Sequence, residues 1–174
     1  GKKIKQFIYI SSDAVYSDSK KPLDEKSETK PKSLHGIMHL TRELIYKSLF
    51  INNICIIRPT LIFGKNDPHN GYGPNRFLRL VKSNKNIKLF GKGEERRDHI
   101  YLKDVADVII KCILFGYVGI INVVSGKVIS FNEIAKFIIS NLNNKSKVKN
   151  VKRIGPMPHN GYRPFNNKLM KKYF

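Results

Sequence analysis

The chain of 174 residues carries a formal charge of +20, and its 41% hydrophobic residues can build the core of one domain or part of one. No apolar run approaches the roughly 20 residues that a membrane-spanning helix requires, so the sequence predicts no membrane segment. The lysines are scattered and no basic arm or RNA-binding motif is present, which argues against nucleic acid and favours an anionic small ligand. Cys55 and Cys112 lie in apolar segments without metal-ligand spacing, so we expect reduced thiols, a cytoplasmic protein and no metal site.

The first predicted element is a buried parallel strand over residues 6–11, a short apolar and aromatic run. Ser12 and Asp13 follow it directly, at the edge where open α/β sheets bind ligands. A polar loop over 17–32 leads to a long helix and then to a second apolar strand over 54–58. Strand, helix and strand in this order predict a right-handed parallel crossover, and therefore an α/β fold.

The long helix, predicted over residues 33–50, carries an unusual polar pattern. His35, His39, Arg42 and Tyr46 recur at spacings of three or four, so one helix presents them as a single stripe. The two imidazoles admit three interpretations: an acid/base pair that faces a substrate, a structural hydrogen-bonded pair, or metal ligands for which the sequence offers no clear third partner.

The second half of the chain alternates helices and short strands. A Gly- and Asn-rich loop is predicted over residues 59–73. The elements predicted after it are a helix over 75–83, a strand over 87–90, an extended segment over 96–101, a helix from the N-cap Asp104 to about 114, a strand over 119–123, and a helix that Ser130 and Glu133 begin with a capping box. The last 30 residues are predicted to be irregular until a short terminal helix.

Five motifs occur in order along nearly the whole chain. They are Ser-Ser-Asp-Ala-Val-Tyr at 11–16; Pro22-Leu23 with Glu25; Pro31, His35-Gly-Ile-Met-His39 and Glu43; Ile57-Arg-Pro-Thr-Leu-Ile-Phe-Gly64; and Gly91-Lys-Gly-Glu-Glu-Arg-Arg-Asp-His-Ile-Tyr101 followed by Asp104. Together they resemble the extended short-chain dehydrogenase/reductases, the NAD-dependent epimerase/dehydratase family that acts on nucleotide sugars. The resemblance implies the C-terminal part of a Rossmann-like parallel sheet plus a small substrate-binding lobe.

This implied fold makes residues 1–174 a single partial domain. Residues 1–60 would form the end of the cofactor-type sheet with the active-site helix, and 61–174 a mixed substrate-binding lobe with the remaining strands.

The resemblance also implies roles for individual residues. Ser12, Asp13, His35 and His39 take the catalytic positions, with Ser12 polarising a sugar oxygen and His35 moving a proton. His39 and Pro59 take cofactor-binding positions. The substrate-binding positions fall on Asn75, Arg76, Leu89, Arg97 and Arg163. Of these, Arg97 and Arg163 would bind the diphosphate, Asn75 and Arg76 would begin a helix whose free N–H groups face it, and Leu89 would lie near the base.

The sequence departs from the family pattern at several points. The glycine-rich dinucleotide-binding motif is absent from the chain, so NAD or NADP is implied only by resemblance. His35 and His39 stand where the family has Tyr and Lys, and Leu61 stands where it commonly has Asn. Ala14 replaces the Glu base of the dehydratases, which disfavours a 4,6-dehydratase. The chain is either a fragment or a natural short protein.

These departures leave two functional hypotheses. The first is a nucleotide-sugar epimerase, dehydratase or reductase in which hydride transfer at a sugar carbon is impaired in this chain alone. The second is a non-catalytic module that binds a nucleotide-sugar or another anion, or serves in assembly. Because strands of a truncated sheet would leave apolar surface exposed, we also expect a homodimer that covers it.

Overall fold

The computed structural model describes residues 4–65 and 67–174, which form a mixed α/β structure with three small sheets. The predicted α/β class is therefore confirmed. The first sheet is parallel, in the order β1 (Phe7–Ile10), β2 (Ile54–Pro59) and β6 (Gly119–Val123). The predicted crossover is α1 (Leu34–Leu49), which links β1 to β2.

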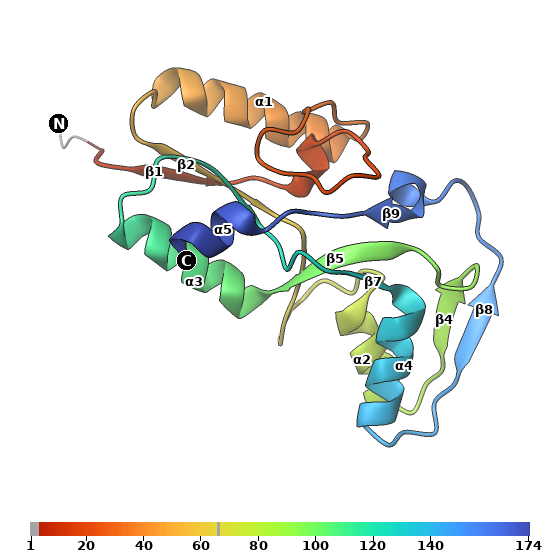
Figure 1. Ribbon diagram of the computed structural model, residues 1–174. Coiled ribbons are helices and arrows are strands. Elements are labelled where there is room, and N and C mark those ends of the chain that lie inside the picture. Colours follow the sequence, from red (N-terminus) through yellow and green to blue (C-terminus); the bar gives the residue numbers. More distant parts are fainter. Residues whose placement is uncertain (1–3, 66) are drawn as a thin grey trace.

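Two layers of helix cover this sheet (Figure 1). The ring of Tyr46 on α1 packs against Phe7 on one face. On the other face, a core of β2 and β6 side chains packs against α3 (Leu102–Leu114) and α5 (Lys168–Tyr173). Every residue of β2 is buried, as expected of a central parallel strand. Cys55 and Cys112 are free thiols within this core.

The remaining strands form two smaller sheets. The second sheet contains β3 (Leu61–Phe63), β5 (Arg96–Tyr101), β7 (Val128–Ser130) and β9 (Tyr162–Arg163), and the third pairs β4 (Ile87–Phe90) with β8 (Val148–Val151). Helices α2 (Pro74–Lys82) and α4 (Phe131–Asn141) pack beside the third sheet and share its apolar core. Short 3₁₀ turns, η1 (Asp13–Val15) and η2 (Pro158–Gly161), follow β1 and precede β9.

Most predicted elements match the structure, and the differences have local causes. The capping box of Ser130 and Glu133 is present at the start of α4. The prediction that Asp104 caps a helix is wrong, because β5 runs directly into α3, Tyr101 is the N-cap and Asp104 lies in the first turn. The prediction that the last 30 residues are irregular is also wrong in part, since β8 and β9 both lie there. Within the predicted 59–73 loop, residues 61–63 form β3.

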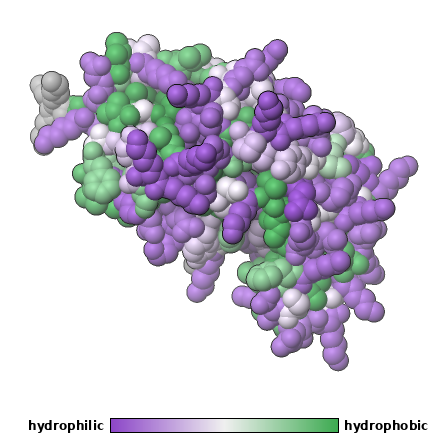
Figure 2. Space-filling model, viewed as in Figure 1, coloured by the Kyte–Doolittle hydropathy of each residue, from purple (hydrophilic) through white to green (hydrophobic). Residues whose placement is uncertain are grey.

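The apolar side chains of α1 point away from the sheet. Leu34, Met38, Ile45 and Leu49 share one stripe of the helix, and all of them are exposed. Figure 2 shows a mostly hydrophilic face whose apolar atoms include a group at the end of the molecule that carries α1 and β1. The side chains of α1 that face the sheet are instead largely polar.

A buried ion pair joins α1 to β2. The Arg58 guanidinium donates to both carboxylate oxygens of Glu43, and both side chains are almost completely buried. The Ser11 hydroxyl donates to the same carboxylate at 2.6 Å. The Arg58 guanidinium also lies over the Tyr16 ring, 4.7 Å from its centroid. Removal of either charge would leave the other buried and uncompensated.

We therefore expect Glu43→Gln to lower the free energy of unfolding by about 3–5 kcal/mol. Urea denaturation followed by circular dichroism measures the change. The matched control is Asp107→Asn, which removes a carboxylate from the exposed Lys103–Asp107 pair and should cost less than about 1 kcal/mol. Equal losses in the two variants would show that leaving Arg58 without its carboxylate carries no special cost.

His99 is a half-buried neutral imidazole between the second sheet and α4. Its Nδ1 is 3.2 Å from the Arg97 carbonyl, so Nδ1 carries the proton, and its Nε2 has no partner among the described residues. The ring packs edge-on against Phe131. Burial lowers the pKa of His99 to about 4, because this environment opposes the charged form.

This lowered pKa predicts a pH dependence of stability. An unfolded histidine takes up a proton near pH 6.5, whereas folded His99 does so only near pH 4. The contribution of neutral His99 to the free energy of unfolding is therefore complete above pH 6.5 and is lost as the pH falls toward 4. The loss amounts to about 3 kcal/mol. In His99→Phe this part of the acid slope should vanish, whereas His69→Phe, at an exposed histidine, should keep it. Urea midpoints between pH 4 and 7 test this, and an unchanged slope in His99→Phe would contradict it.

Candidate functional site

Ser12 and Asp13 lie at the C-terminal end of β1, where the sequence predicts a ligand edge. Ser12 is the N-cap of η1, and its Oγ accepts a hydrogen bond from the Ala14 N–H at 3.2 Å. Its hydroxyl is half-buried and can still donate to a ligand oxygen. Asp13 is buried, and its carboxylate accepts from the Arg163 guanidinium at 2.9 Å.

The start of α1 is held close to this strand end by a glycine. A Cβ at Gly36 would lie 2.2 Å from the Ala14 carbonyl oxygen, so only glycine permits this approach of the helix to η1. Ser33 caps the helix by accepting from the Gly36 N–H. His35 is the neighbour of Gly36, and the contact therefore brings its exposed ring to the same end of the sheet as Ser12.

His35 and His39 lie together, as their spacing predicts. Their ring centroids are 4.6 Å apart with an edge-on geometry. The His39 Nδ1 is 2.8 Å from the Tyr9 hydroxyl of β1. Burial lowers the pKa of His39, and the charges of His35 and Arg42 lower it further. Tyr9 is a residue that sequence analysis missed, although its period-2 position on β1 relative to Phe7 could have placed it against α1.

Arg163 occupies a different environment from the one that the resemblance implies. Its guanidinium is fully buried; its N–H groups donate to the Asp13 side chain and to the carbonyls of Asp13, Tyr16 and Ser17, and the remaining one faces the Asp18 carboxylate at 3.5 Å. The His159 Nδ1 lies 2.6 Å from that carboxylate and donates to it. A guanidinium has five N–H donors, and these contacts use all of them. In this structure Arg163 ties β9 to the end of β1 and leaves no donor for a phosphate.

Arg97 and Arg153 together offer the donors that Arg163 lacks. Both guanidiniums pair with the buried Glu95 carboxylate, Arg97 at 3.2 Å and Arg153 at 3.6 Å. The Nε atom of each is buried without a hydrogen-bond partner among the described residues. An unpaired buried N–H is costly, so two adjacent ones indicate a place for an acceptor. Arg153 is the second functional candidate that sequence analysis missed, because only the fold brings it beside Glu95.

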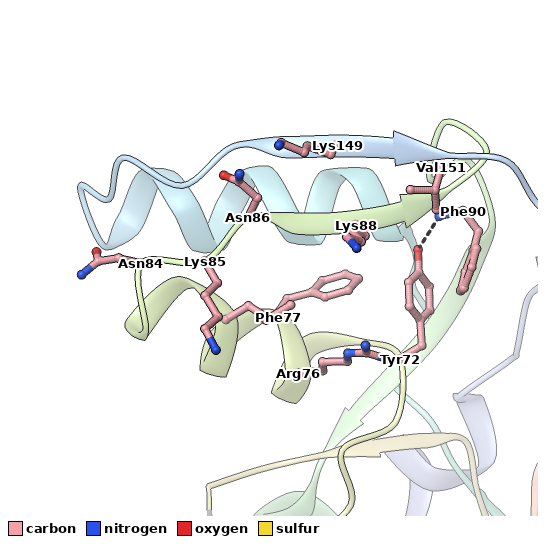
Figure 3. Close-up of a pocket in the computed structure, with 11 residues that line it drawn as sticks. Tyr72, Arg76, Phe77, Asn84, Lys85, Asn86, Lys88, Phe90, Lys149 and Val151 are labelled. Atoms are coloured by element: carbon pink, nitrogen blue, oxygen red, sulfur yellow. Dashed lines mark hydrogen bonds between the residues drawn. The ribbon is translucent and has the colours of Figure 1, made fainter.

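A cavity of about 590 Å³ lies next to these arginines, between α2, β4 and β8 (Figure 3). The Arg153 guanidinium reaches the carbonyl of Phe90, a residue of the cavity wall. The walls combine aromatic, aliphatic and cationic side chains, namely Tyr72, Arg76, Phe77, Leu80, Asn84, Lys85, Asn86, Lys88, Phe90, Lys149 and Val151. Tyr72 accepts from the Phe90 N–H, and its own proton stays available because burial raises its pKa.

The polar side chains of this cavity offer donors almost exclusively. Its lining contains one arginine and three lysines but no carboxylate. The amide oxygens of Asn84 and Asn86 already accept from Asn144 and from the Lys147 N–H, which leaves only their NH₂ groups. A ligand that fits here therefore presents acceptor oxygens or negative charge.

Of the other predicted site residues, one lines the cavity and the rest are buried or engaged in hydrogen bonds. Arg76 lines the cavity, whereas the Leu89 side chain is fully buried in the core and the exposed neighbours Lys88 and Phe90 face the cavity instead. The Asn75 amide is engaged with Asp67 and with the Gly64 N–H. Pro59 is buried at the end of β2.

Neither a metal centre nor a membrane helix can be assigned within residues 4–65 and 67–174. No group of three or more histidine, cysteine and acidic side chains there could hold a metal ion. None of the helices in these ranges has the length and apolar character needed to cross a bilayer.

Comparison with known proteins adds the following relatives. The chain is 25% identical to mouse dTDP-D-glucose 4,6-dehydratase over 169 residues, which are 92% of this chain and 47% of that protein. It superposes on UDP-N-acetylglucosamine 4-epimerase of Methanobrevibacter ruminantium, in complex with UDP-N-acetylmuramic acid, with a TM-score of 0.85 and 27% identity over 98% of this chain and 56% of that one. UDP-glucuronic acid 4-epimerase of Bacillus cereus, in complex with UDP-glucuronic acid and NAD, shares the fold at a TM-score of 0.85 and 20% identity, over 98% and 55% of the two chains.

The chain therefore spans about half the length of the relatives that it matches. Residues 1–123 match the NAD dependent epimerase/dehydratase family, which is more than two thirds of the chain. Together with the Rossmann-like parallel sheet, this match shows that the chain belongs to the NAD-dependent epimerase/dehydratase family.

Proposed function

We propose that this chain forms the nucleotide-sugar-binding part of an NAD-dependent epimerase/dehydratase-type protein. The observation that carries the proposal is the pair of buried Nε–H groups of Arg97 and Arg153 that have no partner among the described residues. Arg153 reaches the cavity wall at Phe90, and Arg97 pairs in register with Arg163, which contacts Asp13 after β1. Within this chain, residues 1–60 would supply the end of the cofactor-type sheet, and 61–174 the substrate-binding lobe with the remaining strands.

The cavity between α2 and β4 would hold the base of the nucleotide. Tyr72 and Phe90 have ring centroids 5.1 Å apart and offer flat apolar surfaces to a planar base (Figure 3). The surrounding donors favour a base with carbonyl oxygens. The UDP and dTDP named for the relatives carry uracil and thymine, which have such oxygens.

The diphosphate would lie over Arg97 and Arg153. Each planar guanidinium can add a charge-assisted hydrogen bond to a phosphate oxygen through its free Nε–H. The cavity residue Arg76 lies in the first turn of α2, and the N-cap Gly73 has no side chain to satisfy the first-turn N–H groups. These groups and the helix dipole favour an anion.

The sugar would then extend toward Ser12 and His35, where the family performs hydride transfer at a sugar carbon. NAD supplies the hydride acceptor in that chemistry. The residues of this chain do not fit the whole cofactor, because the sequence contains no glycine-rich phosphate-binding loop and His39 offers no charge comparable to a lysine. We infer that tight NAD binding and turnover are impaired in this chain alone.

The second candidate is a non-catalytic module that keeps the nucleotide-sugar or anion pocket. The lowered pKa of His39 favours it, because a neutral imidazole cannot replace the lysine cation that activates the family's tyrosine. The free, buried cysteines agree with the reducing conditions of a cytoplasmic location, which we propose for either candidate.

Isothermal titration calorimetry with UDP-glucose and dTDP-glucose tests the proposal. We expect saturable binding of at least one of them by the 174-residue chain. Arg97→Ala should weaken it by roughly 10- to 100-fold, since a hydrogen bond to a charged group is worth about 1.5–3 kcal/mol. Arg96→Ala is the matched control: this neighbouring arginine is exposed and pairs with Glu133, so its loss should change affinity less than about twofold.

Absence of binding by both nucleotide-sugars would refute the function proposed here, as would equal effects of the two arginine variants. NAD alone, titrated under the same conditions, should give no tight stoichiometric binding. A stoichiometric NAD complex would contradict the inferred impairment.

We further propose that the protein forms a homodimer through the exposed apolar stripe of α1. Leu34, Met38, Ile45 and Leu49 are between about half and four-fifths exposed, at 78%, 49%, 50% and 66%. Exposed apolar stripes of this kind mark protein contacts.

Sedimentation velocity should accordingly show a dimer whose population rises with concentration. Ile45→Glu places a charge in the apolar stripe and should yield monomer. Phe137→Glu, the same kind of change at an exposed apolar residue of α4, should leave the dimer intact. A monomer at all concentrations in the unmodified protein would rule out this interface.

A further inference from the structure

A hydrogen bond between Tyr9 and His39 joins β1 to α1. The Tyr9 hydroxyl lies 2.8 Å from His39 Nδ1, and the two rings are tilted with centroids 5.9 Å apart. Burial raises the pKa of Tyr9, so the phenol keeps its proton at neutral pH. A phenol can both donate and accept, but the Arg42 guanidinium offers a donor to the Tyr9 oxygen, which favours the phenol proton pointing to Nδ1. In that arrangement the proton of a neutral His39 resides on Nε2.

The groups around His39 also favour its neutral form. The titratable and charged groups near it are Tyr9 on β1 and His35, Arg42 and Glu43 on α1. The two cationic groups oppose a charge on His39. Glu43 would favour it, but that carboxylate is already committed to Arg58 and Ser11. His39 thus lacks a free counter-charge among the described residues.

We propose that Tyr9 is a positioning residue that holds His39 as the neutral Nε2–H tautomer, so that His39 offers a ligand oxygen one hydrogen-bond donor and no charge. The ligand part of this inference rests on the proposed function: the acceptor is a hydroxyl or ether oxygen of a sugar or ribose at the Ser12 end of the sheet. No hydrogen bond involves the His35 ring among the described residues, so its ring nitrogens stay available to a ligand.

Long-range ¹H–¹⁵N NMR of the ligand-free chain tests the tautomer directly. Protonated and unprotonated ring nitrogens differ strongly in shift, and the five histidines are few enough to assign with single His→Gln variants. We expect His39 to carry its proton on Nε2 in the unmodified protein. Tyr9→Phe should give a mixture of tautomers and raise the pKa of His39 by about 0.5–1 unit, because a hydrogen bond to the neutral form is lost.

Tyr46→Phe is the matched control. The Tyr46 ring also packs against Tyr9, with centroids 5.0 Å apart, but among the described residues its hydroxyl makes no hydrogen bond to His39, so the tautomer and pKa of His39 should not change. His39 with its proton on Nδ1 in the unmodified protein would overturn the proposal, and so would equal shifts in the two tyrosine variants. Should Tyr9→Phe fail to fold, the tautomer of the unmodified protein alone decides.

Addition of UDP-glucose tests the ligand part separately. We expect the Nε2 and Hε2 resonances of His39 to shift on saturation, whereas the Nδ1 resonance shifts less. Calorimetric binding without any change at Nε2 would refute the donor role and leave nucleotide-sugar binding intact. Absence of binding would refute the proposed function and leave the tautomer result unaffected.

Discussion

The buried ion pair of Arg58 and Glu43 is the interaction on which the candidate site depends. Glu43 lies on α1, two turns after His35 and one turn after His39, and Arg58 lies on the central strand β2. Ser11 adds the end of β1 to the same carboxylate, and Tyr16 adds the segment after η1 through its ring. A buried pair is costly unless its polar atoms are hydrogen-bonded; here both carboxylate oxygens accept from side chains, whereas the Arg58 Nη1 atom has no partner among the described residues. The pair thus fixes the orientation of α1 more than it adds net stability.

The elements that follow from local pattern could be predicted from the sequence, and those that need a distant partner could not. Helix α4 follows from its capping box, and β2 from the apolar run of residues 54–57. Strand β8 reads Val-Lys-Asn-Val with two lysine neighbours, and it becomes a strand only because β4, about 60 residues earlier, pairs with it. The outward apolar face of α1 was hidden for a similar reason: periodicity shows that a stripe exists, but not which side of the helix meets the sheet.

The arginines of the site illustrate the same limit. Arg97 could be found from its motif, because the strand and the turn before it are local features. The choice between Arg153 and Arg163 could not be made from the sequence, since both lie in a basic stretch near the C-terminus without a strong local pattern. Only the fold shows that β9 carries Arg163 into the core beside β5, while Arg153 remains at the cavity wall.

Two clusters of arginines and carboxylates differ in charge, and the difference indicates where an anion would be held. In the first cluster, Arg97 and Arg153 share one carboxylate, Glu95, so the cluster keeps an excess positive charge. In the second cluster, the single Arg163 contacts two carboxylates, those of Asp13 and Asp18. Coulomb interactions are stronger in a poorly hydrated site than at the surface. The surface lysines that contribute to the +20 charge are screened beyond about 8 Å at physiological salt. The difference in charge between the two clusters therefore has the larger effect on a bound anion. The net charge can draw an anion toward the protein, and under the proposed function the excess positive charge around Glu95 favours a place beside the cavity over one beside Asp13.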